Sequence, residues 1–130
     1  MKFLLDTNAV IAIFRGDEKM LARLSQHKPT DFGLPAIVLH ELFCGATKSQ
    51  RKLENVRRIE GLQFEVIELD AADARVAGEI RAQLAASGTP IGPYDILIAG
   101  QAVTRGLTLI THNVGEFSRV SGLSLEDWEV

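Results

Sequence analysis

Short apolar runs alternate with longer helical segments along the whole chain, and this order limits the possible folds more than any other feature. Four of the runs have the length of a buried strand, namely 2–5, 32–34, 64–69 and 107–111, and a shorter one lies near 123–125. Because strands and helices follow one another in turn, the sequence predicts an α/β fold with helices on both faces of a parallel sheet.

The segments between these runs carry apolar residues at helical spacing. In the best defined of them, Ala72, Val76, Ile80 and Leu84 are each four residues apart. The segment that opens at Tyr94 is almost wholly apolar, which indicates a helix buried on most sides. The predicted helices are 8–14, 17–27, 36–47, 48–60, 70–86 and 94–105.

The composition is that of one globular domain spanning residues 1–130. With 130 residues, 46% of them hydrophobic, and a formal net charge of −3, the chain can bury a core but cannot bind nucleic acid by bulk charge alone.

The single cysteine, Cys44, excludes a disulfide framework and is expected to be a small core residue. No apolar run reaches the ~18 residues needed to cross a bilayer. The absence of a signal peptide pattern favours the cytoplasm.

Two acids stand where predicted strands are followed by helices. Asp6 comes directly after the first strand, so it is expected at the carboxyl edge of the sheet, where α/β proteins bind ligands. It could equally be a helix N-cap. Glu41 shares a helix face with Ile37 and Val38, and an acid on an apolar face requires a partner. That partner could be a metal ion, an arginine or a backbone amide.

Asp95 and the segment after the fourth run extend the pattern. Asp95 opens the apolar helix at the same edge of the sheet, although an acid at a helix start can also be a simple cap. Asn113 and Glu116 follow a predicted strand and are expected at this edge too, unless the segment is a plain turn. His112 could be a general base or a solvated loop residue.

Together these acids predict a metal site. Several carboxylates at one edge would repel one another, and they coexist most easily around a hard divalent cation such as Mg²⁺ or Mn²⁺. Such an ion can activate water and stabilise the leaving oxygen when a phosphodiester bond is cut. The chain has no HExxH, CxxC, P-loop or GxGxxG motif, so zinc, nucleoside triphosphate and dinucleotide chemistry have no support.

Five basic residues lie within eleven positions that hold a single acid, Glu54. They could form a groove for the backbone of a single-stranded or folded nucleic acid, or simply a solvated helix face. Because aromatic residues are few, extensive base stacking is not expected. The candidates for RNA binding are Lys48, Arg51, Lys52, Arg57 and Arg58.

Four motifs, in this order, resemble the signature of PIN-domain ribonucleases, and in particular of the VapC toxins of bacterial VapBC toxin–antitoxin pairs. They are Leu4-Leu5-Asp6-Thr7-Asn8, His40-Glu41-Leu42, the segment 90–99 (PIGPYDILIA) and the segment 109–117 (LITHNVGEF). The resemblance covers essentially the whole chain. It implies a three-layer α/β/α fold and endoribonuclease activity that depends on Mg²⁺ or Mn²⁺.

The same resemblance implies a set of site residues. The acidic metal ligands would be Asp6, Glu41 and Asp95. Asn113 stands where many members of the family have an aspartate, so either Asn113 or Glu116 would assist. Thr7 and Thr111 resemble hydroxyls that orient the first aspartate, and Asn8 resembles an amide near the site.

The resemblance also implies partners. The substrate would be an RNA of the translation machinery, either a transfer RNA or a ribosomal RNA, and the segment Gly92-Pro93-Tyr94-Asp95 favours initiator tRNA. A VapB-type antitoxin would neutralise the toxin, and operator DNA would be bound only through that complex. The toxin would form a homodimer, without a membrane partner.

Other classes remain open from the residues alone. A structure-specific DNA nuclease would use the same carboxylates on another polymer, and a non-catalytic interaction module would use them only as helix caps. A receiver-like phosphoacceptor domain is disfavoured, because Thr111-His112-Asn113, without a lysine, follows the late strand.

Overall fold

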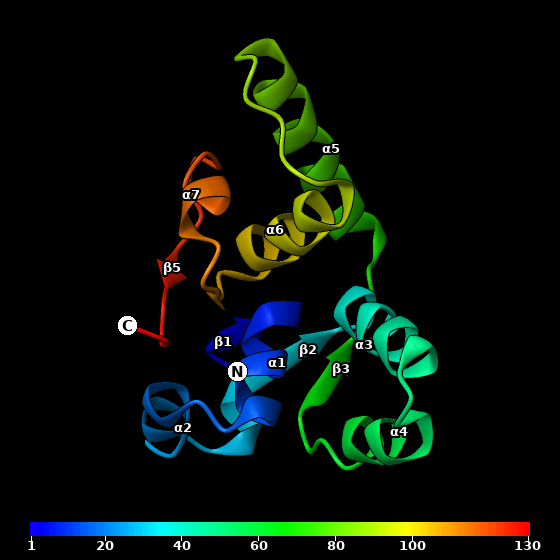
Figure 1. The fold of residues 1–130 in the computed structure, drawn as a ribbon. Coiled ribbons are helices and arrows are strands. Elements are labelled where there is room, and N and C mark those ends of the chain that lie inside the picture. The colour runs from blue at the N-terminus through cyan, green and yellow to red at the C-terminus, as the bar shows by residue number, and fades with distance from the viewer.

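A five-stranded parallel sheet forms the centre of the protein in the computed structural model, which describes residues 1–130 (Figure 1). Every strand pair is parallel, and the order in the sheet is β3-β2-β1-β4-β5. The strands are β1 (Phe3–Leu5), β2 (Phe32–Pro35), β3 (Glu65–Ile67), β4 (Thr108–Ile110) and β5 (Leu125–Glu126). The predicted three-layer α/β/α class is confirmed.

Seven α-helices surround this sheet. They are α1 (Thr7–Arg15), α2 (Glu18–Leu24), α3 (Ala36–Lys48), α4 (Lys52–Glu60), α5 (Ala71–Ala86), α6 (Pro93–Arg105) and α7 (Val114–Phe117), and a 3₁₀ turn, η1 (Pro29–Asp31), leads into β2. In Figure 1 the helix α5 extends to the top of the molecule, and the largely buried α6 lies below it. Gly100 permits their close packing, because a Cβ atom there would lie 2.7 Å from the Cβ of Ala77. No helix combines the length and hydrophobicity that a bilayer crossing requires.

Most predicted elements are found with ends shifted by a few residues, but two expectations are wrong and one alternative is excluded. The helix expected from residue 48 begins only at Lys52, because Ser49–Arg51 form a turn in which the Ser49 hydroxyl accepts from the backbone N–H of Arg51. The segment after β4 forms the short helix α7, which excludes the alternative of a plain turn. Cys44 is exposed, because it lies opposite the buried face of α3 that carries Leu42 and Ala46.

The register of β1 and β4 places two strand ends side by side. Leu5 pairs with Ile110, and the backbone N–H of Asp6 donates to the carbonyl of Ile110. The residues that follow the two strands, Asp6 and Thr111, therefore meet at the carboxyl edge of the sheet.

A tryptophan fixes the C-terminal segment to this sheet. Trp128 is 1% exposed, and its ring packs edge-on against Phe3 at 5.0 Å and Phe32 at 5.8 Å between centroids. Arg23 covers the indole at 5.2 Å and pairs with Glu126 at 2.8 Å. Residues on either side of Trp128 are thereby held against the body of the protein.

The helices α5 and α6 share one ion pair with a buried acid. Asp73 of α5 is fully buried, and its Oδ2 accepts a hydrogen bond of 2.9 Å from Arg105 of α6. Its other oxygen, Oδ1, has no hydrogen-bond partner. Burial raises the pKa of Asp73, but the Arg105 guanidinium and the backbone N–H of Asp70 outweigh it and keep that pKa below its ordinary value.

Candidate active site

Asp6 lies at the carboxyl edge between β1 and β4, with only 4% of its surface exposed. Its Oδ1 accepts from the backbone N–H of Ala9 at 2.8 Å, which caps α1, and its Oδ2 accepts from the hydroxyl of Thr111. The two interpretations of Asp6, cap and edge residue, are therefore compatible.

Glu41 reaches the same edge from α3, where it is half-buried. Its Oε1 accepts a hydrogen bond of 2.8 Å from the hydroxyl of Thr7, the first residue of α1. The expectation that Thr7 orients Asp6 is wrong, because this hydroxyl binds Glu41 instead. Neither an arginine nor a backbone amide pairs with Glu41, so the structure does not support those two alternatives for it.

Asp95 completes the acidic group from the first turn of α6. Its pKa is raised to about 6, chiefly by burial and then by a hydrogen bond with Glu116 and by the charges of Glu116, Asp6 and Glu41. Burial likewise raises the pKa of Asp6 to about 6, against the stabilising hydrogen bonds from Thr111 and Ala9. The structure thus brings all four carboxylates within electrostatic reach of one another.

Asn113 positions one of these carboxylates. Its Nδ2 donates to Glu116 Oε2 at 2.8 Å, and its backbone N–H donates to the hydroxyl of Thr111 at 2.9 Å. Thr111 therefore links Asn113 to Asp6. Asn8, by contrast, is exposed and lines a surface cavity together with Asn113.

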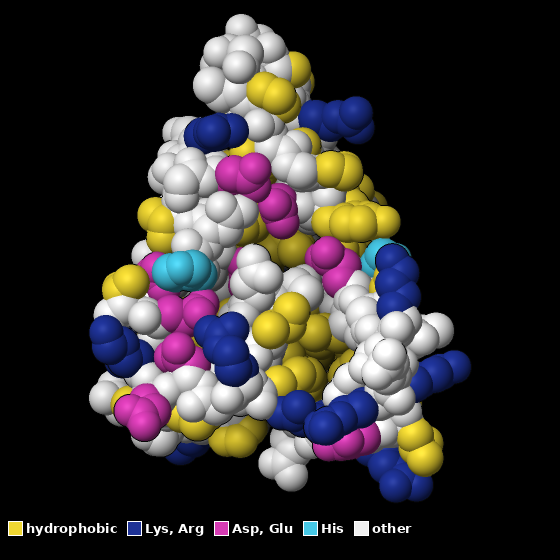
Figure 2. Space-filling model, viewed as in Figure 1, with side chains coloured by type: hydrophobic (Ala, Val, Ile, Leu, Met, Phe, Trp, Pro, Cys, Tyr) yellow, Lys and Arg dark blue, Asp and Glu magenta, His cyan; other side chains and the backbone are white.

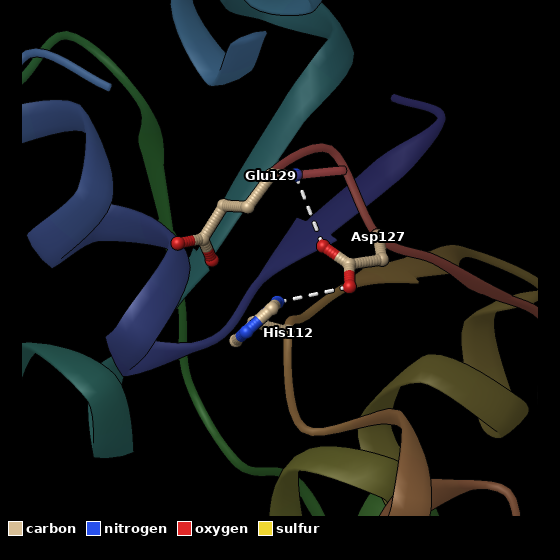
Figure 3. A group of neighbouring side chains, drawn as sticks. All are labelled: His112, Asp127 and Glu129. Atoms are coloured by element: carbon tan, nitrogen blue, oxygen red, sulfur yellow. Dashed lines mark hydrogen bonds and ion pairs between the residues drawn. The ribbon is translucent and has the colours of Figure 1, made fainter. Parts of the chain in front are cut away.

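A second group of ionisable side chains lies beside the first, and no sequence pattern indicated two of its three members. His112 Nδ1 is 2.9 Å from Asp127 Oδ2, and the backbone N–H of Glu129 donates to Asp127 Oδ1 at 3.0 Å (Figure 3). One ligand atom from each of these residues lies within 4.8 Å of the others. Arg15 pairs with Glu129 at 3.1 Å, so the group is satisfied within the protein.

The acidic edge opens to the surface. Figure 2 shows acidic side chains around a hollow with a hydrophobic floor, and Lys and Arg side chains over α3 and α4 at the lower right. An apolar cavity of about 240 Å³ begins at Thr7 and Glu41 and extends between α1, α3 and α4 to Asn55 and Arg58. The predicted basic residues Arg51, Lys52, Arg57 and Arg58 line an exposed surface on and before α4, and Lys48 ends α3. Figure 2 therefore places basic groups beside the hollow.

The donor set of the acidic edge fits a hard divalent cation. Its side-chain ligands are carboxylate oxygens, which Mg²⁺ and Mn²⁺ prefer over nitrogen and sulfur. Burial chiefly, and neighbouring acidic charges in addition, raise the pKa of Asp6 and Asp95, and no basic side chain forms an ion pair with the four carboxylates. A cation of charge two would supply the compensating positive charge.

The comparisons with known proteins all identify the same family. Residues 3–123 match the family model described as PIN domain. The chain is 41% identical over 98% of both chains to a protein from Shigella flexneri called tRNA(fMet)-specific endonuclease VapC, and 35% identical over 99% of both to ribonuclease VapC2 from Rickettsia felis. It superimposes with a TM-score of 0.92 and 40% identity, over 98% of both chains, on a chain in the crystal structure of DNA-bound VapBC from Salmonella typhimurium.

Proposed function

The chain is a PIN-domain ribonuclease of the VapC family, and from this membership we propose that it is the toxin of a VapBC-type pair whose substrate is initiator tRNA. PIN-domain nucleases of this family hydrolyse phosphodiester bonds. The choice of substrate is supported by the Shigella relative, whose name specifies tRNA(fMet).

The cofactor we propose is Mg²⁺ or Mn²⁺, held by Asp6, Glu41, Asp95 and Glu116. The observation that carries this proposal is the convergence of four carboxylates at one edge of the sheet, where burial chiefly and acidic charges in addition raise the pKa of Asp6 and Asp95 to about 6. When bound, such an ion activates water and stabilises the leaving oxygen of a phosphodiester.

The protein's own residues hold this arrangement in place before substrate arrives. Hydrogen bonds from Thr111, Thr7 and Asn113 reach three different carboxylates, which limits their rotation. A site fixed in advance needs no costly reorganisation during the reaction. The neutral Asn113 acts in this account through Glu116, which would be the fourth acid.

The exposed basic face of α4 would hold the RNA backbone. We expect the double variant Lys52→Glu, Arg57→Glu to cut RNA about tenfold less efficiently at low salt, because phosphate contacts supply much of RNA affinity. The difference should shrink as salt is added. Initial rates across a salt series measure it. The matched control, Arg75→Glu with Arg81→Glu on the exposed side of α5, should leave the rate unchanged. Equal losses in both double variants would contradict a role for this face.

A VapB-type antitoxin would neutralise the enzyme, and the complex would bind operator DNA through the antitoxin. This proposal is supported by the DNA-bound VapBC structures from Salmonella typhimurium and Rickettsia felis, to which the chain is 40% and 33% identical. A growth-arresting ribonuclease requires such a partner in its host.

The decisive experiment incubates the purified, partner-free protein with initiator tRNA, elongator tRNA and single-stranded DNA. Each reaction is run with Mg²⁺, Mn²⁺ or EDTA. We expect discrete fragments of initiator tRNA with either metal and none with EDTA. The variant Glu41→Gln, which keeps the side-chain size and an oxygen for the Thr7 hydroxyl, should produce no fragments.

Each result decides one part of the proposal. Equal cleavage of both tRNAs would remove the initiator assignment but keep the ribonuclease. Cleavage of DNA alone would favour the structure-specific DNA nuclease. Cleavage that persists in EDTA, or in Glu41→Gln, would exclude catalysis by a metal ion at these carboxylates.

A further inference from the structure

One exposed aromatic side chain borders the acidic site. Tyr94 is 46% exposed and is the one aromatic residue among the exposed large apolar side chains of the protein. It directly precedes Asp95 in the first turn of α6. Its backbone position therefore adjoins that of Asp95, with Cα atoms about 3.8 Å apart.

A second ring faces Tyr94 from another helix. His40 of α3 is exposed, and its ring meets that of Tyr94 edge to face, with 5.2 Å between centroids and 67° between planes. His40 directly precedes Glu41, as Tyr94 precedes Asp95. Neither side chain makes a hydrogen bond within the protein. Each ring therefore comes one residue before a carboxylate of the site.

We propose that Tyr94 and His40 form a stacking platform for one unpaired RNA base beside the bond that is cut. This inference rests on the proposed ribonuclease function and names the substrate conformation that the site selects. Unpaired bases stack on aromatic rings in proteins that recognise single-stranded RNA. An edge-to-face pair leaves a ring face open to a third partner, and both rings are exposed here.

The position of the platform explains how the site can select its substrate. A base inside a duplex is already stacked on its neighbours and cannot lie on a protein ring without being extruded. A single-stranded loop presents such a base at no such cost. Both rings belong to residues that adjoin site carboxylates in the chain, so we expect the platform to act on a nucleotide near the cut.

Two other molecules could pack on the exposed ring of Tyr94, and each would give a different experimental result. An apolar side chain of a protein partner could pack on Tyr94, and so could a second copy of the chain. The RNA base is favoured because the rings flank the carboxylates that act on RNA, and because Figure 2 shows basic side chains beside the same hollow. Those basic groups complement a polyanion.

The test compares Tyr94→Leu with Tyr94→Phe, and uses Leu21→Ala on α2 as a control of similar exposure at 39%. Cleavage of initiator tRNA gives KM and kcat separately. A short single-stranded oligoribonucleotide carrying 5-iodouridine, alone or in a duplex, is then photo-crosslinked to each protein in EDTA. Mass spectrometry identifies the crosslinked peptide. Thermal melting checks that each variant is folded.

We expect Tyr94→Leu to raise KM about tenfold or more, and Tyr94→Phe to stay within about twofold of the natural protein, because phenylalanine keeps the ring. The crosslink should map to Tyr94 or His40 with the single strand and be absent with the duplex. An unchanged KM in Tyr94→Leu, or crosslinks only elsewhere, would overturn the platform. If Tyr94→Leu keeps its KM but loses self-association or antitoxin binding, the ring contacts a protein, and the platform for an RNA base is likewise overturned. If the natural protein cuts no RNA, the proposed function fails, and the crosslink still decides whether the platform binds a base.

Discussion

Replacing Asp95 with asparagine is expected to reduce RNA cleavage on the order of a thousandfold or more and, at the same time, to stabilise the metal-free protein. Cleavage falls because asparagine removes one of the charges proposed to hold the divalent ion. Stability rises because burial and the neighbouring acids disfavour the Asp95 carboxylate, whose pKa they raise to about 6. Cleavage rates and thermal melting in EDTA measure the two effects.

The gain in stability has a defined dependence on pH. In the folded protein Asp6 and Asp95 bind protons up to about pH 6, whereas the ordinary pKa in an unfolded chain is 3.8. The metal-free protein therefore loses stability as the pH rises from 3.8 through about 6. Asp95→Asn should raise the melting temperature by a few degrees above pH 6 and leave it unchanged below pH 3.8.

Asp17→Asn is the matched control for this variant. Asp17 caps α2 by accepting from the backbone N–H of Met20 at 2.9 Å, and asparagine caps as well as aspartate does. It should leave cleavage unchanged at every pH. If Asp95→Asn cuts RNA at the natural rate, the carboxylate is only a helix cap. If its melting temperature falls at neutral pH, the Asp95 carboxylate stabilises the metal-free fold more than repulsion and burial destabilise it.

Arg105→Met is expected to destabilise the protein by about 2–4 kcal/mol, which lowers the melting temperature by roughly 10 °C. Methionine keeps most of the apolar stem but leaves the fully buried Asp73 without its cation. The expected loss is below that of a wholly buried pair, because Arg105 is 32% exposed and water screens part of the interaction. Urea unfolding at neutral pH measures it.

An exposed ion pair on α5, the helix that carries Asp73, provides the comparison. Arg75 and Glu79 are 3.4 Å apart with side chains 83% and 61% exposed, so Arg75→Met should change stability by less than about 0.5 kcal/mol. Because the folded-state pKa of Asp73 lies below 3.8, its pairing stabilises the protein above that pH and is lost as the pH falls below the folded-state pKa. Losses of equal size in Arg105→Met and Arg75→Met would show that burial of Asp73 carries no penalty.

The sequence pattern predicts the elements well because each depends on local periodicity. It also brings Asp6, Glu41 and Asp95 to one edge, since residues that follow parallel strands or open crossover helices lie there by topology. The partner of Thr7 is not predictable in this way. Its hydroxyl could point to Asp6 or Glu41, and only the packing of α1 against α3 selects Glu41.

Two further features escape sequence reasoning for a related reason. The hydrogen bond between Asn113 and Glu116 depends on α7, a helix of four residues that is too short to show periodicity. The proximity of His112 to Asp127 depends on β5 pairing with β4, a strand of two residues. The first is a local contact whose helix is too short to be recognised, and the second depends on strand pairing that a single sequence does not specify.

The hydrogen bond between Thr111 and Asp6 joins residues 105 positions apart in the chain. Contacts of such separation form late and slowly, because a long loop must close before any pairing compensates for the lost entropy. Asp6 reaches its final environment only when β1 has found β4. A chain in which β1 and β4 are not yet paired therefore lacks the hydrogen bond that positions Asp6. The acidic edge is therefore assembled only when almost the whole chain has closed on itself, which ties the geometry of the site to the completed fold.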